Sequence, residues 1–195
     1  MGATAIAITR FLAELLLKLA GWRIEGEIPA TGAYVLIAAP HTSNWDFVWA
    51  MAIAIVLRVK LNWMGKHSLF KPLIGPLFKR WGGIPIRRDE SSNRVALIAE
   101  ELRAAESMVL LVPAEGTRSY AEYWKSGFYR IASAAGVPIV LGYLDYAGRR
   151  GGFGPMLMPT GDLPADMARI RAFYSDCVGK YPHKSGPIRL AEEAS

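Results

Sequence analysis

An apolar run at residues 34–39 constrains the fold of this chain more than any other feature. It reads Tyr-Val-Leu-Ile-Ala-Ala and is bounded by Gly32 and Pro40. A strand without a polar face is typical of a parallel sheet covered by helices on both sides. The polar stretch His41–Asp46 follows it, and a helical pattern covers residues 45–57. Because short strand-to-helix junctions in such sheets face ligand crevices, we expect the functional site at this junction.

The rest of the chain repeats the alternation of strands and helices. Further strands are predicted at residues 22–27, 59–64, 82–88, 108–112, 137–145 and 153–158, helices at 69–81, 93–105, 128–135 and 164–178, and a glycine-rich hairpin or loop at 148–154. At 195 residues the chain is long enough for one well-packed core. We therefore predict a single-domain α/β fold with a mostly parallel central sheet flanked by helices.

An amphipathic helix is predicted at the N-terminus, over residues 3–20. Arg10, Glu14 and Lys18 form one narrow polar stripe, and nearly all the remaining circumference is apolar. No run of eighteen apolar residues occurs, so a spanning helix is not expected. We interpret residues 1–21 as a helix lying in a membrane interface, the alternative being a helix packed on the core.

Charge and cysteine content narrow the range of partners. The formal net charge is +6, which favours anionic partners, and six tryptophans beside many aliphatic residues favour a phospholipid surface. The basic residues are dispersed and no nucleic-acid-binding module is recognisable, so nucleic acid is not expected as a partner. Cys177 is the single cysteine, which excludes an internal disulfide, and no cysteine/histidine cluster has the spacing of a zinc site.

His41 and Asp46 are the candidate acid/base pair. Imidazole titrates near neutrality, and a carboxylate can fix its tautomer. Positions five apart diverge by roughly 140° on one helix, so the pair can meet only if His41 precedes the helix and folds back over its first turn. Ser43 followed by Asp46 resembles a helix-capping pair, which permits that geometry. The alternative is that Asp46 only caps the helix and His41 bonds a loop carbonyl.

Two more polar loops follow predicted strands. The strand at residues 82–88 ends in Arg87 and Arg88, whose guanidinium groups match phosphate oxygens. The strand at 108–112 leads into a loop with Glu115-Gly116-Thr117-Arg118-Ser119, in which glycine permits close backbone approach and the other side chains offer polar groups. Together the three loops predict a base next to a cationic pocket of phosphate size.

Four ordered blocks resemble the glycerolipid acyltransferase family. They are His41–Asp46 for the H-x-x-x-x-D block, Gly82–Arg88 for the second block with its terminal arginine, Glu115–Ser119 for the third and Val137–Val140 for the fourth. Their order and spacing over residues 40–140 make the resemblance far more specific than any block alone. One departure is that Ala114 stands between Pro113 and Glu115, where the family usually reads Phe-Pro directly before the glutamate.

The resemblance implies transfer of a fatty acyl group from acyl-CoA or acyl-ACP to the hydroxyl of a lysophospholipid, foremost 1-acylglycerol-3-phosphate, giving phosphatidic acid. His41 is implied as general base and Asp46 as the group that orients it. The implied site residues are the catalytic His41 and Asp46 and the substrate-binding Arg88, Glu115, Gly116, Thr117 and Arg118. No metal or redox cofactor is implied, because the thioester donor is already activated.

The N-terminal helix and the four blocks together give an expectation for the domain organisation and the location. Residues 22–195 are expected to form the acyltransferase domain, and residues 1–21 to hold it on the cytoplasmic face of a membrane as a peripheral or monotopic protein. Three alternatives remain open at this level. They are another lyso-lipid as acceptor, a thioesterase in which His41 activates water, and a non-catalytic protein that binds anionic membranes.

Overall fold

β2 (Ala33–Ala39) lies at the centre of a seven-stranded sheet with the order β1-β7-β6-β2-β5-β3-β4. The computed structural model describes residues 3–30, 32–86 and 91–194. The other strands are β1 (Arg23–Glu25), β3 (Leu61–Lys66), β4 (Gly83–Ile86), β5 (Met108–Val112), β6 (Ile139–Asp145) and β7 (Arg150–Leu157). Every neighbouring pair is parallel except β6 and β7. The predicted α/β fold with a mostly parallel sheet is therefore confirmed.

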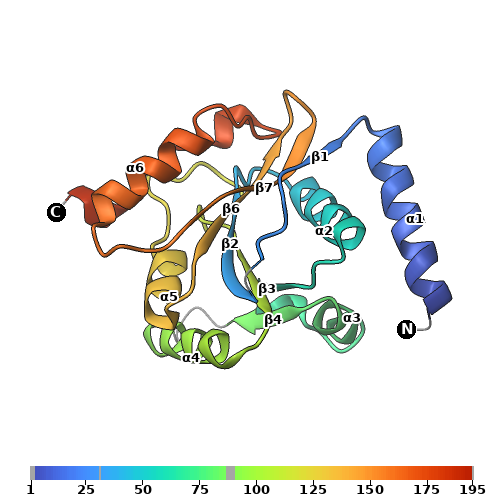
Figure 1. The fold of residues 1–195 in the computed structure, drawn as a ribbon, viewed down its shortest axis with the longest axis horizontal. Coiled ribbons are helices and arrows are strands. Elements are labelled where there is room, and N and C mark those ends of the chain that lie inside the picture. The colour runs from blue at the N-terminus through green and yellow to red at the C-terminus, as the bar shows by residue number, and fades with distance from the viewer. Residues whose placement is uncertain (1–2, 31, 87–90, 195) are drawn as a thin grey trace.

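Helices cover both faces of the sheet (Figure 1). They are α1 (Ala3–Leu19), α2 (Trp45–Leu57), α3 (Gly75–Arg80), α4 (Ser91–Ala104), α5 (Gly127–Ala135) and α6 (Leu163–Tyr174), with short 3-10 turns at His67–Leu69, Pro182–Lys184 and Ala191–Ala194. Val35 and Ile37 of β2 point into a core shared with α4, α5 and α6, whereas Tyr34 and Leu36 point to the α2 side. This alternation explains why the strand has no polar face.

Two elements differ from the sequence-based expectation near the C-terminus. β7 begins at Arg150, inside the predicted glycine-rich loop, because this segment pairs with β6 in a register that sets Asp145 opposite Arg150. α6 ends at Tyr174 instead of residue 178. The backbone of Val178 is taken by other partners, since its carbonyl accepts from the Tyr146 N–H and its own N–H donates to the Asp145 side chain.

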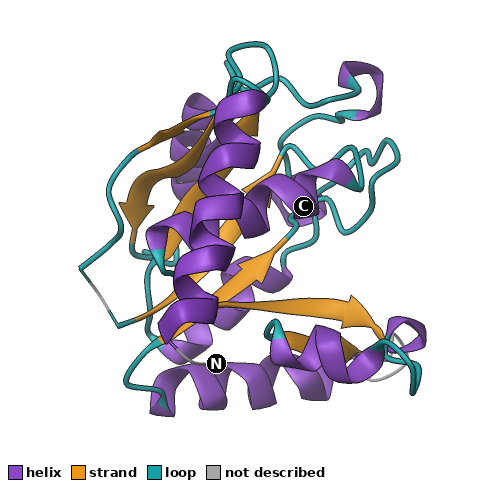
Figure 2. Ribbon diagram, turned by 90° about the vertical axis from the view of Figure 1, so that its right-hand side faces the viewer, coloured by secondary structure: helices purple, strands orange, loops and turns teal. Residues whose placement is uncertain are grey.

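The predicted N-terminal helix is present as α1, the outermost element on the side that also carries α2 (Figures 1 and 2). Its contact surface is narrow, with Ala13 and Leu17 packed in a cluster that includes Trp22 and Trp49. A second stripe of α1 is apolar and exposed, formed by Ile8, Phe11, Leu12, Leu15, Leu16 and Leu19. No helix within the described residues is long and apolar enough to cross a membrane.

Candidate active site

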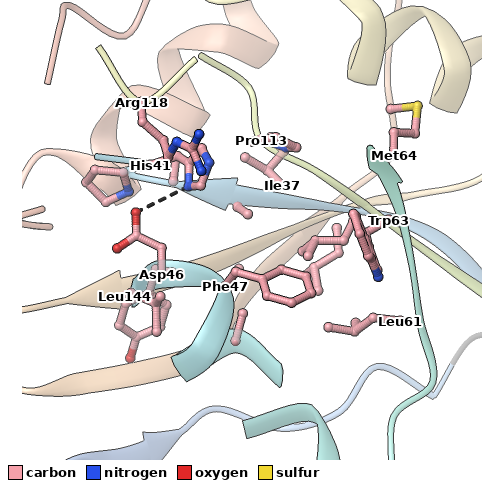
Figure 3. Close-up of a pocket in the computed structure, with 18 of the residues that line it drawn as sticks. Ile37, His41, Asp46, Phe47, Leu61, Trp63, Met64, Pro113, Arg118 and Leu144 are labelled. Atoms are coloured by element: carbon pink, nitrogen blue, oxygen red, sulfur yellow. Dashed lines mark ion pairs between the residues drawn. The ribbon is translucent and has the colours of Figure 1, made fainter. Parts of the chain in front are cut away.

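His41 and Asp46 meet at the junction between β2 and α2. His41 Nδ1 lies 3.2 Å from Asp46 Oδ2 (Figure 3), and the two side chains are 20% and 6% exposed. Because the carboxylate faces Nδ1, it favours the tautomer that carries its proton there and leaves Nε2 free to accept one. The geometry expected for an acid/base pair is thus realised, with His41 ahead of the helix and folded back over its first turn.

Asp46 also organises the loop in front of α2. Its Oδ2 accepts the backbone N–H groups of Thr42 and Ser43, each at 2.8 Å, and Ser43 Oγ accepts the N–H of Trp45 at 3.2 Å. Burial raises the pKa of Asp46, but hydrogen bonds from His41, Tyr146 and the Ser43 amide outweigh it, so that the net pKa is lowered. The carboxylate is therefore ionised at neutral pH and able to stabilise an imidazolium.

The Glu115 side chain holds the backbone of His41 through a hydrogen bond. Its Oε1 accepts the backbone N–H of His41 at 2.8 Å, and the residue is only 5% exposed. Burial raises the pKa of this carboxyl group. Glu115 does not line the cavity beside His41, and its side chain contacts the loop that carries His41. The contact forms although Ala114 stands between Pro113 and Glu115. Ala114 is itself buried, and its carbonyl accepts the N–H of Lys125.

The loop after Glu115 forms the mouth of the site. Gly116 has a φ of 67°, a left-handed conformation that favours glycine, and a Cβ there would lie 2.9 Å from the Lys125 side chain. Thr117 and Arg118 are exposed and line the cavity, and the Arg118 guanidinium donates to the Asn44 side chain. Arg88, the other predicted phosphate ligand, lies outside the described residues.

A long apolar cavity of about 670 Å³ opens beside His41 between α2 and the sheet (Figure 3). Its polar wall is at the mouth, and its deeper walls are apolar side chains that include Leu36, Phe47, Ile53, Leu61, Trp63, Leu111, Leu144 and Phe153. The lining follows α2 from Asp46 to Ala54, about 12 Å at a rise of 1.5 Å per residue. Ala50, on the α2 wall, has only a methyl side chain and so leaves this part of the cavity open.

Tyr146 is a site residue that sequence reasoning missed. Its hydroxyl donates to Asp46 Oδ1 at 2.7 Å, across 100 residues of sequence. It directly follows β6, a neighbour of β2 in the sheet, so it emerges close to the catalytic loop. Its position just after a predicted strand was the available signal, although the sequence did not establish that this strand lies beside residues 34–39.

An ionised carboxylate beside a partly exposed histidine at the mouth of an apolar cavity is an arrangement compatible with general-base chemistry. Comparison with known families specifies the class further. The sequence model of the Acyltransferase family matches residues 22–141, more than half of the chain. The chain therefore belongs to the Acyltransferase family, which confirms the resemblance carried by the four sequence blocks.

A solved structure has a similar fold. The 1-acyl-sn-glycerophosphate (LPA) acyltransferase PlsC from Thermotoga maritima aligns with a TM-score of 0.58 over 88% of this chain and 76% of that chain. The two sequences are 16% identical, so the likeness concerns the fold. No curated protein matches the sequence.

Proposed function

We propose that this acyltransferase moves a fatty acyl group from acyl-CoA or acyl-ACP to the hydroxyl of a lysophospholipid, foremost 1-acylglycerol-3-phosphate. The observation that carries the proposal is the His41–Asp46 pair at the mouth of a deep apolar cavity. A cavity of this size and lining suits an acyl chain, and its polar mouth then brings the reacting carbonyl close to His41.

The chemistry follows from the free Nε2 of His41. It removes the proton from the acceptor hydroxyl while that oxygen attacks the thioester carbonyl, and Asp46 stabilises the resulting imidazolium. The tetrahedral intermediate collapses with cleavage of the carbon–sulfur bond, and the imidazolium returns the proton to the leaving thiolate. Neither residue forms a covalent intermediate. A thioester is already activated, so the proposed reaction uses no metal or redox cofactor.

The test is transfer of labelled acyl groups from acyl-CoA and from acyl-ACP to 1-acylglycerol-3-phosphate in detergent or vesicles. Phosphatidic acid is the expected product. Product only with another lyso-lipid would move the assignment to that acceptor. Release of free fatty acid without an acylated acceptor would indicate hydrolysis by a water molecule activated at His41.

Arg118 is proposed to bind the acceptor's phosphate, because its guanidinium lies at the cavity mouth and is exposed. We expect Arg118→Ala to raise the KM for 1-acylglycerol-3-phosphate about 10- to 100-fold, the worth of a charge-assisted hydrogen bond. The KM for 1-monoacylglycerol, which has no phosphate, should change little. Arg169→Ala, at an exposed position on α6, is the matched control. Equal losses with both acceptors would contradict the assignment.

The exposed apolar stripe of α1 is proposed to lie in the headgroup region of a phospholipid membrane, where the acceptor is found. Replacing both Leu12 and Leu15 with glutamate should weaken binding to anionic vesicles at least tenfold, because burial of each leucine contributes about 1.5–3 kcal/mol. The measurement is co-sedimentation with the vesicles. Ala7→Glu, which adds a charge on the polar stripe of the same helix, should have a much smaller effect. Unchanged binding of the double variant would exclude this orientation.

A further inference from the structure

The two carboxylate oxygens of Asp46 have very different surroundings. Oδ2 lies near three donors, namely His41 Nδ1 and the backbone N–H groups of Thr42 and Ser43. Within the described part of the chain, Oδ1 has one hydrogen-bond donor, the Tyr146 hydroxyl at 2.7 Å. Asp46 is 4% exposed, so loss of that hydroxyl would leave a charged oxygen without a protein partner.

Tyr146 is itself held by segments far apart in sequence. Its ring packs edge-on against Trp22 with the ring centroids 5.0 Å apart, and Trp22 stacks on Trp49 of α2. Its backbone N–H donates to the Val178 carbonyl at 2.8 Å. These contacts fix the position from which the phenol reaches the carboxylate.

We propose that Tyr146 is a positioning residue for acyl transfer, whose hydroxyl holds the Asp46 carboxylate in the orientation that presents Oδ2 to His41. The inference rests on the proposed role of His41 as general base. Burial and the neighbouring Asp46 charge raise the pKa of Tyr146, so the phenol stays protonated and acts as a donor. It does not touch the reacting atoms and acts through Asp46 alone.

The hydroxyl also affects how readily the His41–Asp46 dyad takes up a proton. A donor on Oδ1 stabilises the anion, and its removal makes the dyad a stronger proton acceptor. Among the described residues, the other titratable or charged groups near the dyad are Glu115, whose side chain bonds the His41 backbone, Arg118 at the cavity mouth, and Lys180 and Tyr181 of the C-terminal segment. Tyr146→Phe alters none of them, so a change in the pH profile reports the lost hydroxyl.

The test compares Tyr146→Phe with Tyr129→Phe. Tyr129 is a matched control because its hydroxyl also donates to an aspartate, Asp166, at 2.8 Å, and it does not line the cavity. Tyr146→Phe should lower kcat about tenfold, the effect of one lost hydrogen bond to a charged group, with little change in KM. The acid limb of the kcat/KM profile should move to higher pH. Tyr129→Phe should change neither.

A measurement that needs no turnover separates this inference from the proposed function. NMR titration of the His41 ring signals, assigned by comparison with His41→Ala, should show the dyad taking up its proton at higher pH in Tyr146→Phe and at the wild-type pH in Tyr129→Phe. If wild type transfers no acyl group, the titration still decides the role of Tyr146. A folded Tyr146→Phe protein with wild-type kcat and titration, or with an effect confined to KM, would overturn the proposal.

Discussion

Replacement of His41 by alanine is expected to lower kcat by about 10²- to 10⁴-fold, because it removes the proposed general base. Among the described residues the imidazole forms an ion pair with Asp46, which fixes its tautomer and stabilises its protonated form. Without the imidazole the acceptor hydroxyl keeps its proton during attack, and alanine offers no substitute. The measurement is steady-state acyl transfer at saturating donor and acceptor.

His67→Ala provides the control for His41→Ala. His67 is an exposed histidine in the turn after β3, and it does not line the cavity. Its replacement should leave kcat near the wild-type value. Far-UV circular dichroism and thermal unfolding must show that both variants fold. Activity close to wild type in a folded His41→Ala protein would contradict the assignment of the base.

Ala50→Phe should convert the enzyme to one that prefers short acyl chains. Ala50 lies midway along the cavity wall that α2 forms between Asp46 and Ala54, so a phenyl ring there blocks the deeper half. Each methylene that is excluded from the apolar cavity lowers the binding free energy of the acyl chain by about 0.8 kcal/mol. Exclusion of about four methylenes then lowers kcat/KM for a hexadecanoyl donor about 200-fold, and an octanoyl donor should be nearly unaffected.

Val48→Phe is the matched control for the cavity variant. Val48 is on the same helix but is 38% exposed and outside the cavity lining. The same enlargement at this position should leave the chain-length profile unchanged. The profile is measured as kcat/KM over donors of increasing length. If Ala50→Phe retained the wild-type profile, the acyl chain would have to bind elsewhere.

The contact between His41 and Asp46 was predictable from sequence because its determinants are local. His41 and Asp46 are five positions apart, and the apolar strand before them with the helical pattern after them fixes the junction that joins them. The fold class followed from the same local patterns, repeated along the chain. The likeness of four blocks to a known family then assigned a reaction to residues that, taken singly, were compatible with several.

The support of the pair was not predictable, because it depends on which strands become neighbours. Glu115 reaches the His41 backbone since β5 pairs with β2 on one side, and Tyr146 reaches Asp46 since β6 pairs with β2 on the other. The single sequence does not state this strand order. The cavity was not predictable from the sequence either, because its walls combine side chains of α2 with those of several strands.

The central position of β2 also bears on the stage of folding at which the contacts to His41 and Asp46 can form. The strand and the dyad are synthesised early, but the supporting Glu115 and Tyr146 lie 74 and 100 residues beyond the residues they hold. Closing loops of this length is slow compared with forming local structure. We therefore expect the contacts that support the dyad to form late in folding, after β5 and β6 have paired with β2. We expect a nascent chain that has not yet formed β6 to lack the Tyr146 contact and to be less active than the folded protein.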